Sequence, residues 1–226
     1  ACHGKPLAEL GFPESPLALP GRAAFDAWLE KGASVHCEGG LSPQRPLVVG
    51  HGQLYLHRYW FHEQRVAERL LGLASAPPPP LDLAAPTFRR AFDALFPGTD
   101  KLQRRAAEHV LESAFTVVAG GPGTGKTTTV AYLLYLYFLL EPRARVAVAA
   151  PTGKAAARLN ESIRGEAVRV HQALGQLGLA SDAALAAVQR VSGSTIHRLL
   201  GTLGGDTTRF RPARERPLAL DGLVVD

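Results

Sequence analysis

Residues 120–127 read Gly-Gly-Pro-Gly-Thr-Gly-Lys-Thr and match the pattern G-x-x-x-x-G-K-[ST] at every fixed position. An apolar stretch at 115–119, predicted as a buried strand, precedes them, and a predicted helix at 126–140 follows. The glycines allow consecutive backbone N–H groups to turn inward around an anion, and the positive end of the helix dipole points to the same place. This stretch, called the phosphate loop below, therefore predicts a binding site for a nucleoside triphosphate.

The chemistry of such a loop assigns roles to its side chains. Lys126 can reach the β- and γ-phosphate oxygens, and the Thr127 hydroxyl is placed to ligate Mg²⁺. Upstream, the amide of Gln103 could pair with N6 and N7 of adenine, although taken alone it would be a surface glutamine. Kinases, GTPases, transporters and helicases all use this loop, so the rest of the chain must choose between them.

Strand and helix patterns alternate outward from the loop. Strands are predicted at 115–119, 145–150 and 223–225, and helices at 101–113, 126–140 and from 151 to 163, with two more Ala/Leu-rich helices that end near residue 200. Strands that alternate with helices favour a parallel sheet with right-handed crossovers. We therefore expect an α/β fold for this part of the chain.

The N-terminal part has a different pattern. A short amphipathic helix is predicted at 23–30, a hairpin at 47–49 and 54–56, and a helix at 59–73 with Val66, Leu70 and Leu73 on one stripe. Four consecutive prolines at 77–80 are typical of a stiff spacer. We therefore expect a small α+β module at 1–80, a linker with a helix at 81–100, and the α/β lobe at 101–226.

The composition excludes several classes of protein. Hydrophobic residues make up 46% and charged residues 20% of the chain, which is close to the globular average and unlike a disordered chain. The apolar run at 130–140 is too short to span a bilayer, so we expect no membrane segment. Cys2 and Cys37 form no disulfide framework, and the histidines match no zinc-ligand spacing. A net charge of +5 makes a polyanionic partner plausible.

Two further segments could bind phosphate. Thr152 could cap the helix that begins near 151, and its free N–H groups with Lys154 would form a second anion site, suited to a nucleic-acid backbone. An ordinary capped helix is an equal alternative. In the segment 191–201, Ser194 or Thr195 could cap a helix with His197 in its first turn. The stretch 209–216 interleaves an aromatic with arginines, as single-strand binders do, but a charged surface loop fits equally.

Together these segments resemble superfamily 1 helicases, and among them the RecD family. The similar stretches are Gly120–Val130 (GGPGTGKTTTV), Ala150–Leu159 (APTGKAAARL), Ser194–Gly201 (STIHRLLG) and Leu223–Asp226 (LVVD), which resemble motifs I, Ia, Ib and the start of II. Residues 47–67 are similar to the N-terminal module of RecD proteins. The resemblance implies a RecA-like P-loop NTPase lobe, here truncated, behind a module that docks on partner subunits.

The resemblance also implies a set of site residues. Lys126, Thr127 and Asp226 would be catalytic, with Thr127 and Asp226 holding Mg²⁺. DNA would contact Thr152, Lys154, Thr195 and His197. ATP would be bound by Gln103, Gly120, Gly121, Pro122, Gly123, Thr124, Gly125, Lys126, Thr127 and Thr128.

The function implied is that of an ATP-dependent 5′→3′ DNA helicase subunit of an exodeoxyribonuclease V in double-strand break repair and recombination. Its partners would be single- and double-stranded DNA and RecB-like and RecC-like subunits, in the bacterial cytoplasm near the nucleoid. A stand-alone RecD-like helicase, or a non-catalytic interaction module with a vestigial nucleotide site, is the alternative. Because the family's catalytic glutamate would follow Asp226, we expect these residues to be a segment of a longer protein and to turn over little ATP alone.

Overall fold

The structure is a computed structural model that describes residues 47–48, 55–98, 102–121, 123–201 and 217–226, the backbone of 35–37, 49–50, 53–54, 101, 202–203 and 206–210, and the single positions Ala23 and Ala27. The helix predicted at 23–30 otherwise lies outside the described residues. The chain divides into two compact units, Ala1–Gly72 and Leu73–Asp226.

The first unit has a small sheet followed by a long helix. Strands β1 (Val35–Cys37) and β2 (Leu47–Gly50) are parallel, and β3 (Gln53–Leu56) is antiparallel to β2. The predicted hairpin is therefore confirmed, as is the predicted helix, which is α2 (His57–Ala74). Trp60 is buried and lies edge-on to Tyr55, with ring centroids 4.8 Å apart. This contact fixes the start of α2 against the end of β3.

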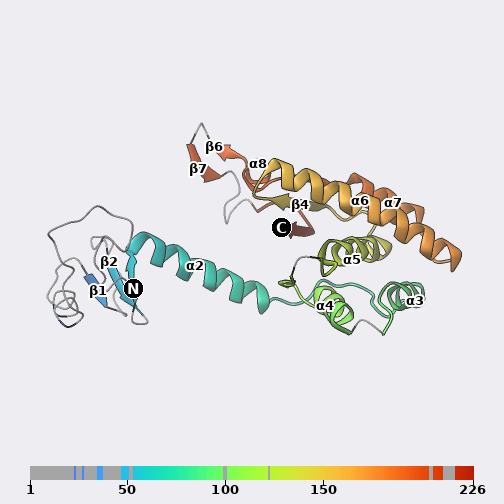
Figure 1. Cartoon of the computed structure of the whole chain (residues 1–226), viewed down its shortest axis with the longest axis horizontal. Helices are drawn as coiled ribbons and strands as arrows, with labels where there is room; N and C mark the ends of the chain where they lie inside the picture. The colour runs from blue at the N-terminus through green and yellow to red at the C-terminus, as the bar shows by residue number, and fades with distance from the viewer. Residues whose placement is uncertain are drawn as a thin grey trace. The chain divides into compact units, whose positions relative to one another are not determined.

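The second unit is an α/β structure around a short parallel sheet (Figure 1). Strand β4 (Val146–Ala150) lies between β5 (Ser192–Thr195) and β8 (Gly222–Val225), and both neighbours are parallel to it. The helices are α3 (Pro86–Leu95), α4 (Lys101–Leu111), α5 (Lys126–Leu140), α6 (Gly153–Gln176), α7 (Asp182–Arg190) and α8 (Ile196–Leu200). A separate two-stranded ribbon is formed by β6 (Thr202–Leu203) and β7 (Asp206–Phe210). The predicted α/β fold with a parallel sheet is confirmed.

The apolar helix α5 forms the centre of this unit. Leu133, Tyr135, Leu136 and Phe138 are among its buried side chains, and it packs against α3, α4, α6 and α7. A helix enclosed in this way is apolar on most faces because most of its faces are covered. Within the residues that the structure describes, every helix falls short of the length and apolar character that a bilayer crossing requires.

The prediction of a strand at 115–119 is wrong for this structure. The segment is irregular, and Val117 is 74% exposed. A strand exists only if a neighbour supplies its hydrogen bonds, and among the described strands β8 pairs with β4 alone. Leu223 and Val225 on β8 are also exposed, and 115–119 lies outside the described sheet.

Two other segments differ from the expectation. The stretch 209–216, treated above as a loop, begins as the end of strand β7, and 211–216 lie outside the described residues. The region 81–100 does more than link. Its helix α3 places Phe88, Ala91 and Phe92 in the core of the second unit.

Candidate functional site

The phosphate loop has the backbone conformation that its glycines were expected to allow. Gly123 and Gly125 have φ angles of 75° and 78°, in the left-handed region that other residues rarely adopt. Gly125 is also the residue that precedes the first turn of α5. The loop therefore turns directly into a helix N-terminus, where unpaired N–H groups favour an anion. Pro122 lies outside the described residues.

Lys126 folds back over this loop. Its Nζ donates hydrogen bonds to the carbonyl oxygens of Gly120 and Gly121, at 2.7 Å each. The ammonium group is thus held at the loop by two neutral acceptors. An anionic phosphate is a stronger partner for an ammonium group than a carbonyl is, so these contacts can exchange for phosphate oxygens.

Close packing inside the loop explains its first glycine. A Cβ atom on Gly120 would come 2.7 Å from Oγ1 of Thr124, which is too close for an unstrained contact. That hydroxyl donates to the carbonyl oxygen of Gly121 at 2.9 Å. Thr124 therefore stabilises the turn by a hydrogen bond that requires glycine at position 120.

Gln103 lies against the same loop. Its Nε2 donates to the carbonyl oxygen of Thr124 at 3.3 Å, and a Cβ atom on Gly125 would come 3.0 Å from that nitrogen. The amide thus joins α4 to the phosphate loop. A glutamine amide has two N–H donors and an accepting oxygen, which are the kinds of group that pair with a base edge.

Three threonines follow Lys126 at the start of helix α5. Thr127 and Thr128 are half-buried, and Thr129 is 3% exposed. The Thr129 hydroxyl donates to the carbonyl oxygen of Gly125 at 3.1 Å. Thr129 thereby ties the first turn of the helix to the end of the loop. Sequence reasoning did not single it out, because only its burial distinguishes it from its neighbours.

The carboxyl ends of the three parallel strands meet at one edge of the sheet. Ala150 pairs with Thr195, and the N–H of Asp226 donates to the carbonyl oxygen of Ala149 at 3.0 Å. A Cβ atom on Gly153 would lie 4.0 Å from the Thr195 side chain. The starts of α6 and α8 and the end of β8 are therefore neighbours, and this set is called the carboxyl edge below.

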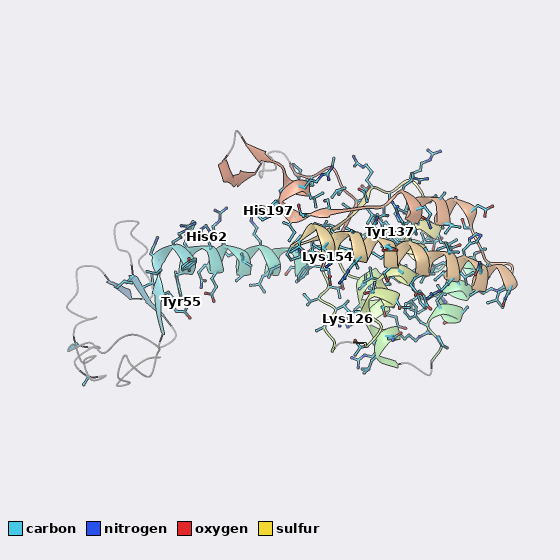
Figure 2. The ribbon with its side chains drawn as sticks, turned by 45° about the horizontal axis from the view of Figure 1, so that its top comes forward. Tyr55, His62, Lys126, Tyr137, Lys154 and His197 are labelled. Carbon is cyan, nitrogen blue, oxygen red and sulfur yellow. The ribbon has the colours of Figure 1, made fainter. Side chains whose placement is uncertain are left out.

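Both helices at the carboxyl edge carry the predicted threonine caps. The Thr152 hydroxyl accepts from the N–H of Ala155 at 3.2 Å, and the Thr195 hydroxyl accepts from the N–H of Arg198 at 3.1 Å. The caps leave other first-turn N–H groups for a ligand. Lys154 and His197, labelled in Figure 2, are exposed next to these caps. The edge thus combines oriented donors with exposed basic side chains.

The structure brings some of the predicted site residues together and leaves others apart. Gln103 joins the phosphate loop, and Asp226 joins Thr152 and Thr195 at the carboxyl edge. Among the described residues, no hydrogen bond links Asp226 to Thr127, the two residues expected to share Mg²⁺. Thr127 lies on α5 and Asp226 directly follows β8, and their sharing of a metal ion stays a prediction.

Buried hydrogen bonds fix the helices on which these groups lie. The Tyr135 hydroxyl is 2.9 Å from Nδ1 of His171 on α6 and accepts from the N–H of Ser181, the cap of α7, at 3.0 Å. Burial raises the pKa of Tyr135 above its ordinary value, so this phenol stays neutral over the physiological pH range. One side chain of α5 therefore holds α6 and α7 in place.

A second polar contact fixes the entry to β8. The backbone N–H of Arg145 donates to Oδ2 of Asp221 at 2.7 Å, and its guanidinium lies 3.4 Å from the same oxygen. These hydrogen bonds from Arg145 lower the pKa of the Asp221 carboxyl below its ordinary value. They set β8, the strand that leads to Asp226, in register with β4.

A glycine loop that opens a helix beside a parallel sheet defines a P-loop nucleotide-binding lobe, and comparison with known proteins agrees. The family model of the AAA domain matches residues 103–226, more than half of the chain. The chain belongs to this family.

The particular relatives are RecD proteins. The chain is 42% identical over 207 residues to the RecBCD enzyme subunit RecD of Mycolicibacterium smegmatis, covering 89% of this chain and 34% of that protein. It is 45% identical over 178 residues to the RecD subunit of Mycobacterium tuberculosis, covering 76% and 28%. The ATP-dependent RecD2 DNA helicase of Deinococcus radiodurans is 30% identical over 174 residues, covering 74% and 23%. The resemblance to RecD proteins is confirmed, and the chain spans about a third or less of these relatives.

Proposed function

We propose that this protein is an ATP-dependent 5′→3′ DNA helicase of the RecD type. It would act as a subunit of a heteromeric exodeoxyribonuclease V in double-strand break repair and recombination. The observation that carries the proposal is the phosphate loop, closed on Lys126 and packed against Gln103. The similarity to proteins named RecD and RecD2 supports a helicase over other users of such a loop.

In this proposal the loop and its surroundings bind ATP. Lys126 exchanges its two carbonyl partners for phosphate oxygens, and Gln103 offers its amide to the adenine edge. Thr127 and Asp226 supply the oxygen donors that Mg²⁺ prefers, and the bound ion would neutralise charge on the β- and γ-phosphates. Closure of the site would bring α5 and the end of β8 together around the nucleotide.

The carboxyl edge is the proposed DNA contact. Helices α6 and α8 present their capped N-termini there, together with Lys154 and His197. Backbone phosphates of a single strand match such donors without regard to base sequence. Because α6 packs on α5, binding or release of a nucleotide at the start of α5 can alter how α6 contacts the single-stranded DNA. ATP binding and release would then alternate the grip on DNA.

The N-terminal unit is the proposed docking module for RecB-like and RecC-like subunits. In support, α2 leaves the apolar side chains of Tyr59, Val66 and Leu70 between 41% and 62% exposed. Exposed apolar patches on a folded unit are typical of interaction surfaces. The whole assembly would act in the bacterial cytoplasm at the nucleoid.

The first test is Lys126→Ala in the full-length protein. Because the lysine would stabilise charge that develops on the phosphates, DNA-stimulated ATP hydrolysis should fall by a factor on the order of a hundred or more. Lys154→Ala is the matched control, since it removes a lysine from the carboxyl edge and should leave hydrolysis at saturating DNA close to normal. Hydrolysis by Lys126→Ala within a few-fold of wild type would contradict the assignment.

Two rivals make different predictions in the same assay. A non-catalytic interaction module would show no DNA-stimulated hydrolysis even in the wild type. A stand-alone helicase would hydrolyse ATP and unwind DNA without a nuclease partner. Co-purification of the full-length protein with large partner subunits separates the stand-alone helicase from the RecBCD-type subunit.

A further inference from the structure

The first turn of α4 carries two adjacent side chains that bind different parts of the second unit. Gln103 donates to the Thr124 carbonyl oxygen in the phosphate loop. Arg104 instead contacts α3, the helix that precedes α4 in the chain. Successive helical residues point about 100° apart, so one helix turn can join two partners. Helix α4 therefore connects α3 to the phosphate loop.

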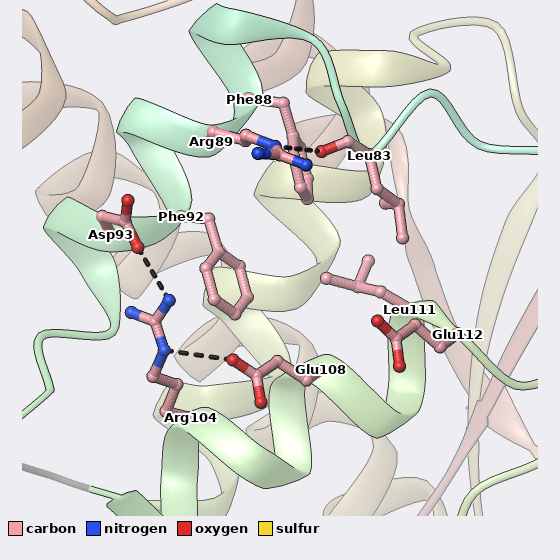
Figure 3. Close-up of a pocket in the computed structure, with 9 residues that line it drawn as sticks. All are labelled: Leu83, Phe88, Arg89, Phe92, Asp93, Arg104, Glu108, Leu111 and Glu112. Carbon is pink, nitrogen blue, oxygen red and sulfur yellow. Dashed lines mark hydrogen bonds and ion pairs between the residues drawn. The ribbon is translucent and has the colours of Figure 1, made fainter.

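The Arg104 guanidinium makes three polar contacts, and Figure 3 shows the two with carboxylates. Its Nη2 lies 2.8 Å from Oδ1 of Asp93, and its Nε lies 3.0 Å from Oε1 of Glu108. Its Nη1 donates to the carbonyl oxygen of Phe96 at 2.8 Å. That carbonyl lies just beyond the last turn of α3, where a cation also meets the negative end of the helix dipole. Arginine suits this position because its planar fork donates in several fixed directions.

The partners of Arg104 belong to a rigid frame. The guanidinium carbon lies 5.0 Å from the centre of the Phe92 ring, and Phe92 and Phe96 are 7% and 2% exposed. Phe96 packs edge-on to Tyr132 of α5, with ring centroids 5.7 Å apart. The Arg104 side chain is 30% exposed, so its contacts are partly shielded from solvent. Arg104 thus fixes α4 relative to the core helix that begins at the phosphate loop.

We propose that Arg104 is a positioning residue that holds the first turn of α4 so that Gln103 lies against the phosphate loop and selects adenine nucleotides. The inference deepens the proposed function, because it rests on ATP binding at that loop. Arg104 makes no contact with the nucleotide in this role. It acts through Gln103, so its removal should alter the choice of base more than the binding of phosphate.

The test compares base preference in the full-length protein. Dissociation constants are measured for ATP and GTP analogues that carry the fluorophore on the ribose, which leaves the base edges unchanged. Gln103→Ala should largely remove the preference for ATP. Arg104→Met keeps an apolar stem over Phe92 but loses the fork, and should reduce the ATP:GTP affinity ratio by roughly threefold to tenfold, the scale of one hydrogen bond. Arg104→Lys should restore only part of the ratio.

Three controls separate positioning from loss of fold. Arg105→Met changes the adjacent, exposed arginine of the same helix and should leave the ratio unchanged. Asp93→Asn leaves α4 intact and removes one exposed partner, so it should shift the ratio in the same direction even if Arg104→Met fails to fold. In the Gln103→Ala background, Arg104→Met should cause no further change in the ratio.

The possible outcomes are distinct. If Gln103→Ala abolishes the preference while Arg104→Met and Asp93→Asn leave it unchanged, Arg104 has no positioning role, and the proposed function stands. An equal loss of ATP and GTP affinity in Arg104→Met also overturns the inference. If Lys126→Ala leaves the affinity for both the ATP and the GTP analogue unchanged, the proposed nucleotide site itself is wrong. A reduced ratio that depends on Gln103 supports the inference.

Discussion

Lys126 and Lys154 in the second unit have different surroundings, and the difference indicates which kind of phosphate ligand each lysine suits. Lys126 is bound by two carbonyl oxygens of its own loop, so its ammonium is already located where a phosphate would bind. Lys154 is exposed in the first turn of α6, beside the cap formed by Thr152. The first is suited to a compact ligand held in a loop. The second is suited to an extended polyanion that passes over the surface.

This difference predicts the behaviour of Lys154→Ala. Loss of one backbone phosphate contact should weaken single-stranded DNA binding alike for all sequences and lower the slope of log affinity against log salt by roughly 0.7. The measurement is fluorescence anisotropy of labelled oligonucleotides over a range of salt concentrations. Arg169→Ala is the control, because Arg169 lies further along α6 and pairs with Glu166. An unchanged slope for Lys154→Ala would assign this lysine to an ordinary capped helix.

Single residues could be predicted from the sequence where their partners are local. The phosphate loop is one continuous motif, so its glycines and Lys126 follow from spacing alone. Gln103 needed a family resemblance, because a lone glutamine has no distinguishing signal. Arg104 could not be predicted, since Asp93 and Phe96 reach it from another helix. The pairing of Thr127 with Asp226 stays a prediction.

At the scale of elements, the packing of α6 on β5 depends on one glycine. A Cβ atom on Gly193 would come 2.6 Å from the backbone carbonyl oxygen of Ala156 and 3.0 Å from Cβ of Asn160. The first contact is with helix backbone, which cannot move as a flexible side chain can. Close approach of this kind requires glycine in the strand. It brings the starts of α6 and α8 together at the carboxyl edge.

Substitution of two glycines should therefore have opposite effects. Gly193→Ala forces α6 away from β5 and should lower the free energy of unfolding by about 1–3 kcal/mol. Gly165→Ala is the matched control, because a Cβ atom there meets nothing within 4 Å. Alanine in that helical position should raise the stability by about 0.5–1 kcal/mol. Urea denaturation followed by circular dichroism measures both, and similar effects of the two variants would contradict the packing argument.

The elements that were missed or wrong show what sequence patterns cannot detect. The strand β5 reads Ser-Gly-Ser-Thr, which has neither apolar alternation nor high strand propensity, and it exists because β4 pairs with it. The apolar segment 115–119 has the composition of a strand but no partner in the described sheet. Helix α5 was predicted correctly because its pattern continues over fifteen residues, whereas a short apolar run could be a helix or a strand. Pairing is a tertiary property, and a single strand does not encode it.

At the scale of the whole molecule, the chain divides after Gly72, while the prediction placed the first boundary near residue 80 and began the lobe at 101. The predicted boundary was based on the four prolines at 77–80, which are a local feature of the sequence. The contacts that assign 81–98 to the second unit are distant in sequence: Phe96 on Tyr132, and Arg104 on Asp93. Boundaries that depend on such contacts cannot be found from composition alone.

The last prediction tests this division with two truncated chains. Residues 73–226 keep α3, so they should unfold cooperatively. Their dissociation constant for a fluorescent ATP analogue should lie within about threefold of that of the 226-residue chain, because the contacts of the phosphate loop lie within this unit. Residues 101–226 lose Phe92 and Phe96, which exposes the apolar faces of Ala107 and Leu111 that lie in the same core. Removal of two buried aromatics typically costs about 3–5 kcal/mol each, enough to unfold a small domain. The shorter chain should therefore aggregate or lack a cooperative transition, with nucleotide binding lost.

Urea titration and equilibrium binding of the ATP analogue are the measurements for both chains. If residues 101–226 fold and bind as well as 73–226, helix α3 is an attachment and the lobe begins at α4; if 73–226 fails to bind, the first unit contributes to the nucleotide site.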